Sequence, residues 1–336
     1  MVRSASTCPV AGLVRLHTFI LILGLLAAPA ARAQTTYMPG TAPPAMAPPD
    51  SVIRVEVHRL APGVFAAKVR YVWTGWVELP EGLLLVDTSL NDTTAAILAD
   101  SIRVYSGDKP VKYIVNTHAH SDHIGGDFYF ASRGATIITQ ANAAARIDSV
   151  MKARASLDRS AKPIKPAVRV DRKKIMGPAE RKIQILWLGK PAHTAGDMIV
   201  YLPKEKILFA GDLISNRAVP WMLDPDMNRK GWIASVDSLW TKAFVYETLV
   251  PGHGTLAKPI DEYRFTASYL NDAYAKAQKE ASWGTSLNAV KDWGFLGSYE
   301  DAEFYAEVHF MNMRRLYNEA RGIKTPGRQQ PGAYRK

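Results

Sequence analysis

The chain has 336 residues, of which 47% are hydrophobic and 22% are charged, proportions that are ordinary for a globular protein. Its formal net charge is +11, but its basic and aromatic residues are not interleaved as in proteins that bind nucleic acids. This composition indicates one large or two modest globular domains, and it argues against a nucleic-acid partner.

The first 33 residues have the layout of a secretory signal peptide. Arg3 and Arg15 precede an apolar run from Phe19 to Ala28, and the small-residue sequence Ala31-Arg32-Ala33 follows. We therefore expect residues 1–33 to be cleaved, which predicts a periplasmic or secreted protein without stable membrane insertion. An uncleaved anchor is the alternative, although the apolar run is short for a membrane span.

The only cysteine of the chain, Cys8, lies inside this predicted signal peptide. The mature protein would therefore have no disulfide and no thiolate to offer a metal ion. Any metal site must then be built from nitrogen and oxygen donors.

Strands and helices alternate in the first half of the chain. Residues 34–50 are rich in Pro, Ala and Thr and predict a flexible linker. Apolar periodicity then predicts strands at Val52–Val57, Leu83–Val86, Val111–Val115 and Thr136–Thr139, a hairpin-like strand region at Val64–Val77, and helices at Thr93–Val104, Phe128–Ser132 and Asn142–Arg154. Such alternation is typical of a layered α/β fold.

The second half begins with a segment, Ser156–Arg181, that is rich in Lys and Arg and has no clear period. We expect a long surface loop there, either a solvated excursion or a flap beside a site. The remaining pattern predicts strands at Ile183–Leu188, Met198–Leu202, Ile207–Ala210 and Thr248–Val250, and helices at Ile233–Phe244, Pro259–Ala281 and Ser298–Ala320. We divide the mature chain into a main domain, a helical extension and a mobile basic tail, over residues 51–260, 261–320 and 321–336.

The most informative stretch is Asn116–Gly126, which reads N-T-H-A-H-S-D-H-I-G-G. Three imidazoles and a carboxylate within six positions would be costly in an ordinary core, because each buried polar group needs a partner. Strand alternation would place His118 and His120 on one side, where both can bind one ion. Asp122 and His123 could then face a neighbouring ion.

The pattern H-x-H-x-D-H-x-G-G after a hydrophobic strand resembles the metallo-β-lactamase-fold hydrolase superfamily. The resemblance covers roughly residues 52–260 and implies a four-layer αβ/βα sandwich, here followed by C-terminal helices. It also implies three further ligands, and the chain offers His193 in G-K-P-A-H-T-A-G-D, Asp212 in I-L-F-A-G-D-L-I and His253 in V-P-G-H-G. The resemblance further implies that the Asp87 carboxylate orients a metal-binding residue without binding the metal itself.

Five of the seven histidines left after signal cleavage occupy these positions, whereas His58 and His309 do not and are expected to be structural. We expect one site from His118, His120 and His193, a second from Asp122, His123 and His253, and a bridging Asp212. A ligand set of nitrogen and oxygen suits zinc, with iron or manganese as alternatives. Two ions about 3.5–4 Å apart can share a hydroxide and stabilise an oxyanion. Asp122 is also the predicted catalytic residue, because it can orient the hydroxide and move its proton.

These residues predict an exported dinuclear metal-dependent hydrolase acting on a small acyl substrate, namely a β-lactam, lactone, ester or thioester. The chain also resembles the zinc β-lactamases but differs from them at two positions. Those enzymes carry Cys where this chain has Asp212 and Lys where it has Ser215. A mononuclear iron enzyme similar to persulfide dioxygenases and a non-catalytic metal-binding periplasmic protein are the alternatives. The substrate and the oligomeric state are not specified by any motif in the chain.

Overall fold

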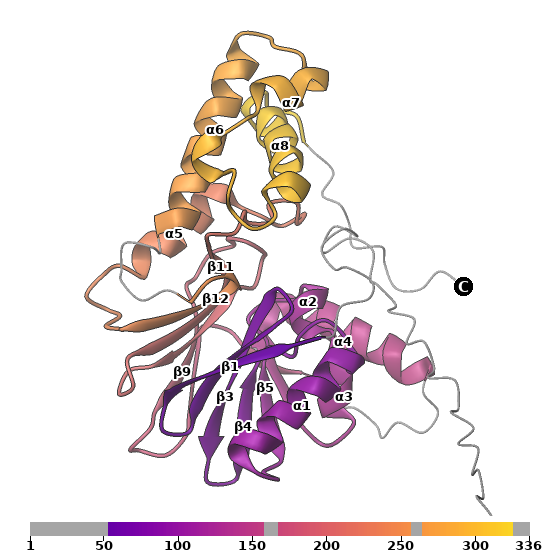
Figure 1. Ribbon diagram of the computed structural model, residues 1–336, viewed down its shortest axis with the longest axis vertical. Helices are drawn as coiled ribbons and strands as arrows, with labels where there is room; N and C mark the ends of the chain where they lie inside the picture. The colour runs from indigo at the N-terminus through magenta and orange to yellow at the C-terminus, as the bar shows by residue number, and fades with distance from the viewer. Residues whose placement is uncertain (1–52, 158–166, 257–263, 325–336) are drawn as a thin grey trace, which may run out of the picture. The chain divides into compact units, whose positions relative to one another are not determined.

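The computed structural model describes residues 53–157, 167–256 and 264–324 (Figure 1). The predicted signal peptide and linker lie outside the described residues, as does most of the predicted tail. Among the helices that the structure describes, none combines the length and the apolar composition needed to cross a bilayer.

The first half of the chain forms a mixed sheet covered by helices. Its strands β1 to β4 pair as antiparallel neighbours, and β4 to β7 run parallel. The strands are β1 (Val55–Ala61), β2 (Val64–Val69), β3 (Val72–Leu79), β4 (Gly82–Val86), β5 (Val111–Val115), β6 (Thr136–Gln140) and β7 (Val168–Val170). The helices that lie together against these strands in Figure 1 are α1 (Asp92–Ser106), α3 (Asp127–Ala131) and α4 (Ala141–Leu157).

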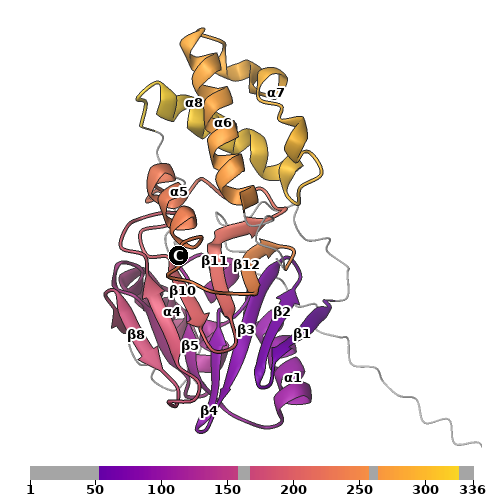
Figure 2. The same ribbon diagram turned by 90° about the vertical axis from the view of Figure 1, so that its left-hand side faces the viewer.

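The second half repeats this plan with fewer strands. Strands β8 to β11 are antiparallel, β12 runs parallel to β11, and β12 meets β3 through the single pair of His253 with Val72. The strands are β8 (Lys173–Met176), β9 (Ile183–Trp187), β10 (Met198–Leu202), β11 (Ile207–Asn216) and β12 (Thr248–Gly254). The helices are α5 (Arg229–Ser238), α6 (Arg264–Ser282), α7 (Val290–Trp293) and α8 (Phe310–Ala320), and Figure 2 shows α6, α7 and α8 close together.

Three apolar clusters hold these layers together. The middle one joins the two halves, because Leu84 and Val115 of the first pack in the same cluster as Val200 and Phe209 of the second. The other two bury the outer faces of the half-sheets against α1, α3 and α4 and against α5, α6 and α8. This order of helix, sheet, sheet and helix confirms the predicted four-layer αβ/βα sandwich with C-terminal helices. The predicted boundary near residue 260 stays a prediction.

The segment predicted as one long loop contains two strands. Residues 158–166 lie outside the described part, but β7 and β8 fill much of the remainder. Both are short strands at the outer edges of the sheet, and most of their side chains are exposed or half-buried. Edge strands commonly carry Lys and Arg, which prevents pairing with other chains but hides the alternation that reveals a strand.

Two predicted helices have different bounds in the structure. Helix α5 begins earlier than predicted because the Asn228 side chain caps it, accepting from the Gly231 N–H at 2.9 Å. The helix predicted over residues 298–320 is interrupted, because Phe304 has a positive φ of 68° and a π-helical turn at Tyr305–His309 precedes α8. Two short 3₁₀ turns, Leu287–Ala289 and Gly297–Tyr299, lie between α6 and this interruption.

We expect Val200→Ala to lower the free energy of unfolding by about 2 kcal/mol, because the side chain is fully buried between the two half-sheets. Val104→Ala is the matched control, since Val104 is 78% exposed on α1 and its loss should change stability by less than about 0.5 kcal/mol. Urea unfolding followed by circular dichroism measures both. Equal values for the two variants would contradict the assignment of a core between the half-sheets.

Candidate metal centre

The histidine motif follows β5 as a tight loop rather than as a continuing strand. β5 ends at Val115, and His120 already stands as the N-cap residue of the short helix α2 (Ser121–Ile124). The expected strand alternation of His118 and His120 is therefore wrong, and the turn of the loop brings their rings to 4.7 Å between centroids. The backbone packs closely at the end of the motif, because a side chain on Gly125 would overlap the backbone of Leu90.

The downstream donors come from the second half-sheet. His193 lies in the turn between β9 and β10, where Asp197 accepts both the Thr194 N–H at 2.9 Å and its hydroxyl at 2.7 Å. Asp212 lies in β11 just after Gly211, whose φ of 52° marks a break in the register with β12. The turn that carries His193 and the register break in β11 beside Asp212 both direct a ligand side chain toward the loop after β5.

The structure brings all seven predicted ligands together as two adjacent buried groups. The first contains His118, His120, His193 and Asp212, and the second contains Asp122, His123 and His253. Donor atoms within each group lie within 4.8 Å of one another. The grouping agrees with the two sets expected from the sequence, while the binding of ions at them stays a prediction.

The carboxylate of Asp212 lies between the two groups. Its Oδ2 atom is 3.3 Å from Nε2 of His193 and 3.3 Å from Nε2 of His253. Its Oδ1 atom is 3.1 Å from Nε2 of His123. One carboxylate therefore faces imidazoles of both groups, which is the geometry that a bridging ligand requires.

The outer nitrogen of three histidines is held by a neighbour. Nδ1 of His123 lies 2.8 Å from Oδ2 of Asp87, as the resemblance implied, and Nδ1 of His253 lies 2.9 Å from the carbonyl oxygen of Tyr71. Nε2 of His120 lies 2.8 Å from Oδ2 of Asp224. Such partners fix the orientation of each ring and direct its other nitrogen inward.

Asp224 was missed by the sequence analysis. It lies in the irregular segment before α5, and Oδ2 also pairs with Nη1 of Arg146 on α4 at 3.1 Å. Nothing in the sequence L-D-P-D separates Asp224 from Asp226, which is exposed two residues later. Only the folded path of the chain shows which of the two carboxylates reaches His120.

The inward-facing atoms fit a cation. Nε2 of His118, Nε2 of His123 and Oδ1 of Asp212 are buried and have no hydrogen-bond partner. Unpartnered buried polar atoms are costly, and divalent ions bound in the two groups would satisfy all three. Imidazole and carboxylate donors without a thiolate suit zinc, iron or manganese.

The two groups differ in charge. Burial lowers the pKa of His118 and His193, the latter to about 3, and neighbouring imidazoles lower both further. Burial acts in the same direction on His253, but the carboxylates of Asp212 and Asp122 outweigh it and raise the pKa of His253 to about 10. His118 and His193 are therefore neutral and can each offer a lone pair to an ion. In the second group a bound ion would replace a proton.

The other histidines and the large hydrophobic residues have structural places. His309 is buried between the hydroxyl of Tyr269 and the carbonyl oxygen of Gly294, and His58 lies beside Glu56 on the surface. Trp73, Trp76 and Met222 are buried core residues, and Trp221 packs against the apolar cluster that contains residues of α5, α6 and α8. Trp232 also touches a predicted ligand, with its ring centroid 4.9 Å from that of His193.

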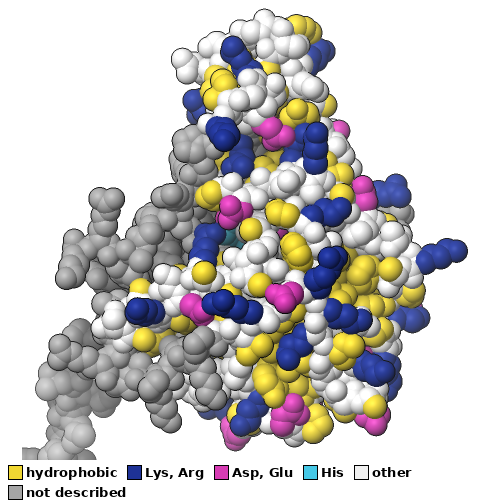
Figure 3. Space-filling view, turned by 180° about the vertical axis from the view of Figure 1, so that it is seen from behind, with side chains coloured by type: hydrophobic (Ala, Val, Ile, Leu, Met, Phe, Trp, Pro, Cys, Tyr) yellow, Lys and Arg dark blue, Asp and Glu magenta, His cyan; other side chains and the backbone are white. Residues whose placement is uncertain are grey.

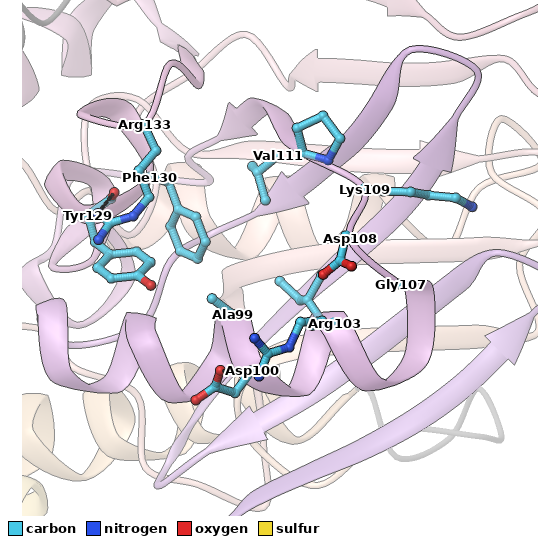
Figure 4. A pocket seen from close by; sticks show the side chains of 12 residues that line it. Ala99, Asp100, Arg103, Gly107, Asp108, Lys109, Val111, Tyr129, Phe130 and Arg133 are labelled. Atoms are coloured by element: carbon cyan, nitrogen blue, oxygen red, sulfur yellow. Dashed lines mark hydrogen bonds and ion pairs between the residues drawn. The ribbon is translucent and has the colours of Figure 1, made fainter.

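A separate hollow of about 300 Å³ lies at the opposite end of β5, between α1 and α3 (Figure 4). Its lining includes Arg103, Val111, Tyr129 and Arg133, and the Arg133 guanidinium lies 3.7 Å from the centre of the Tyr129 ring. No histidine lines it. It therefore does not belong to the two ligand groups.

Comparison with known families decides the relationship. Residues 67–253 match the family model described as the metallo-beta-lactamase superfamily, and this match covers more than half of the chain. The chain belongs to the metallo-beta-lactamase superfamily. The resemblance read from the histidine motif is thereby confirmed.

Several members of the superfamily are similar to this chain. A linear primary-alkylsulfatase from a Pseudomonas species is 25% identical over 53% of this chain and 40% of its own length. Two proteins named metallo-beta-lactamase type 2 are 27% identical: that of Elizabethkingia meningoseptica over 56% of this chain and 69% of its own, and that of Bacillus cereus over 52% and 63%. This superfamily member thus spans less than half of the alkylsulfatase.

Among solved structures, a metallo-beta-lactamase from Pontibacter korlensis has a TM-score of 0.53 and 23% sequence identity. The match covers 65% of this chain and 100% of that chain. This likeness supports the shared fold alone.

We expect Asp224→Asn to weaken metal retention by about 10- to 100-fold, because the amide no longer fixes the His120 ring as the carboxylate does. Asp226→Asn is the matched control, since its side chain is exposed. Competition with a chelator of known affinity measures both variants. Unchanged retention in Asp224→Asn would show that His120 needs no support.

Proposed function

We propose that this chain is a dinuclear metal-dependent hydrolase that cleaves a lactone, ester, thioester or β-lactam. The observation that carries the proposal is the arrangement of seven buried donors in two adjacent groups with Asp212 between them. Membership of the superfamily supports hydrolytic chemistry. Two separate groups of donors favour two ions over one.

The donors divide naturally between two ions, of which zinc is the first choice. His118, His120 and His193 would hold one, Asp122, His123 and His253 would hold the other, and Asp212 would touch both. When bound, such ions lower the pKa of a coordinated water toward ~7 and polarise the bond under attack. Asp87 and Asp224 keep the rings of His123 and His120 in place during the reaction.

Asp122 is the residue that we assign to proton transfer. Its Oδ2 atom lies 3.3 Å from Nε2 of His253, and these two ligands are the most exposed of the seven. A carboxylate at the open side of the site can take up a proton from the attacking water and deliver it to the leaving group. The deeper ligands are sealed from bulk water by the fold.

The neighbourhood of Ser215 favours lactone or ester substrates over β-lactams. At the place where the zinc β-lactamases carry a lysine, Ser215 is buried, and its N–H donates to the hydroxyl of Thr266 on α6 at 2.9 Å. No cation can therefore bind a β-lactam carboxylate from this position. A sulfate ester is a second candidate substrate, supported by the match to an alkylsulfatase.

We also propose that the protein acts outside the cytoplasm, in the periplasm or after secretion. The support for this is the composition of residues 1–33, which lie outside the described part of the structure. A cysteine-free mature chain with nitrogen and oxygen ligands suits an oxidising compartment.

We expect the mature protein to retain about two zinc ions per chain and to hydrolyse γ-butyrolactone, p-nitrophenyl acetate or nitrocefin. Elemental analysis by mass spectrometry gives the metal content, and the same sample is assayed with all three compounds and with dodecyl sulfate. One iron per chain without hydrolysis would instead favour the oxidoreductase alternative. Retained metal without turnover of any compound would favour a binding protein.

Two variants test the division between the ions. We expect His120→Ala and His253→Ala each to lose about one ion per chain and to lower kcat at least about 100-fold, because each removes a donor from a different group. His58→Ala is the matched control, since that ring contacts the Glu56 carboxylate and the Trp73 ring and belongs to neither ligand group. A variant that keeps both ions and full activity would remove its residue from the ligand set.

A further inference from the structure

Phe304 lies in the C-terminal helices, far outside the segment matched by the family model, and yet it contacts a predicted ligand. Its ring is edge-on to His253, with 5.7 Å between the ring centroids. It is also edge-on to Tyr71, at 5.6 Å, and Tyr71 itself stacks on His253 at 5.8 Å. The two aromatic rings thus flank one imidazole of the second group.

The backbone of Phe304 is strained. Its φ of 68° is in the left-handed region, which a bulky aromatic residue rarely adopts. Helical structure starts immediately afterwards with the π-helical turn Tyr305–His309. Strain of this kind persists only where the surroundings impose it, and it is concentrated at functional sites.

The preceding residue, Glu303, is held in place by backbone and side-chain contacts. Its N–H donates to the Arg217 carbonyl oxygen at 3.0 Å, and its own carbonyl oxygen accepts from the Val219 N–H at 2.8 Å. Its carboxylate pairs with Nζ of Lys68 at 3.3 Å, and the same Nζ donates to the carbonyl oxygen of Gly254 at 2.9 Å. Phe304 is therefore tied to the residue that follows His253.

The candidate site opens on the side where Phe304 lies. His118 and His193 are at most 1% exposed, whereas His253 is 8% and Asp122 is 6% exposed. Phe304 is half-buried beside His253 and forms a small apolar cluster with residues that include Tyr71 and Leu90. On the face drawn in Figure 3, a small area of histidine is visible among hydrophobic, basic and acidic side chains.

We propose that Phe304 is a specificity-determining residue, whose ring forms an apolar wall beside the second ligand group. The wall selects substrates that carry an alkyl or aryl group next to the bond to be cleaved. This inference rests on the proposed hydrolase function and narrows its substrate class. The C-terminal helices then contribute directly to the site rather than only covering the second half-sheet.

Binding of two hydroxamates to the zinc-loaded protein tests this wall without requiring turnover. Acetohydroxamate and benzohydroxamate share one metal-binding head and differ in an apolar ring, and calorimetry gives the affinity of each. We expect Phe304→Ala to weaken benzohydroxamate binding about tenfold and to leave acetohydroxamate within about twofold. Phe295→Ala is the matched control, because Phe295 lies in the same helical region and is 51% exposed.

Phe304→Gly provides a second variant that does not depend on tolerating the strained backbone. Glycine adopts a positive φ without cost, so this variant should unfold at a temperature no lower than Phe304→Ala while losing the same benzohydroxamate preference.

Three results would overturn the inference. If both variants keep the wild-type preference for benzohydroxamate over acetohydroxamate, Phe304 has only a packing role. If the affinity for both hydroxamates falls equally, Phe304 only positions His253. A wild-type protein that binds no zinc would overturn the proposed hydrolase together with the wall. Zinc and hydroxamate binding without hydrolysis of any substrate would instead overturn the hydrolase and leave the wall intact.

Discussion

The rest of the site depends on one buried carboxylate. Asp212 lies 4% exposed among four imidazoles, and burial alone would favour its neutral form. The cationic rings of His253 and His123 instead hold its pKa well below the ordinary value. A charge in this position must be balanced from several directions, and this requirement explains why neighbouring strands and loops all direct nitrogen donors toward one point.

Positioning these donors takes a second set of polar contacts that lie behind the ligands. Asp87 and Asp224 each hold the outer nitrogen of one histidine, and Asp197 fixes the turn that carries His193. The Thr117 carbonyl oxygen accepts from the Met198 N–H at 2.7 Å, which ties the loop of one half-sheet to the turn of the other. The geometry of the centre is thus set by polar groups buried just behind it.

How far the sequence could predict this structure depends on whether the information is local. The strand Val111–Val115 and the motif after it are local signals, and the strand is present with the predicted bounds. The roles of Asp224 and Phe304 depend on contacts with residues 104 and 51 positions away, which no periodicity reports. The edge strands β7 and β8 were missed because charged side chains mask their alternation. The break in the helix at Phe304 was missed because a single strained residue does not change the composition of the segment.

The joint between the two half-sheets has a thermodynamic consequence. Within the described strands, β12 and β3 pair only at His253 and Val72, and each ligand group draws donors from both halves. An ion held in either group therefore works as a crosslink across the sandwich, much as a disulfide would in a chain that had cysteines to form one. Folding and metal loading would then be linked equilibria, so that the loaded protein would be more stable than the metal-free protein.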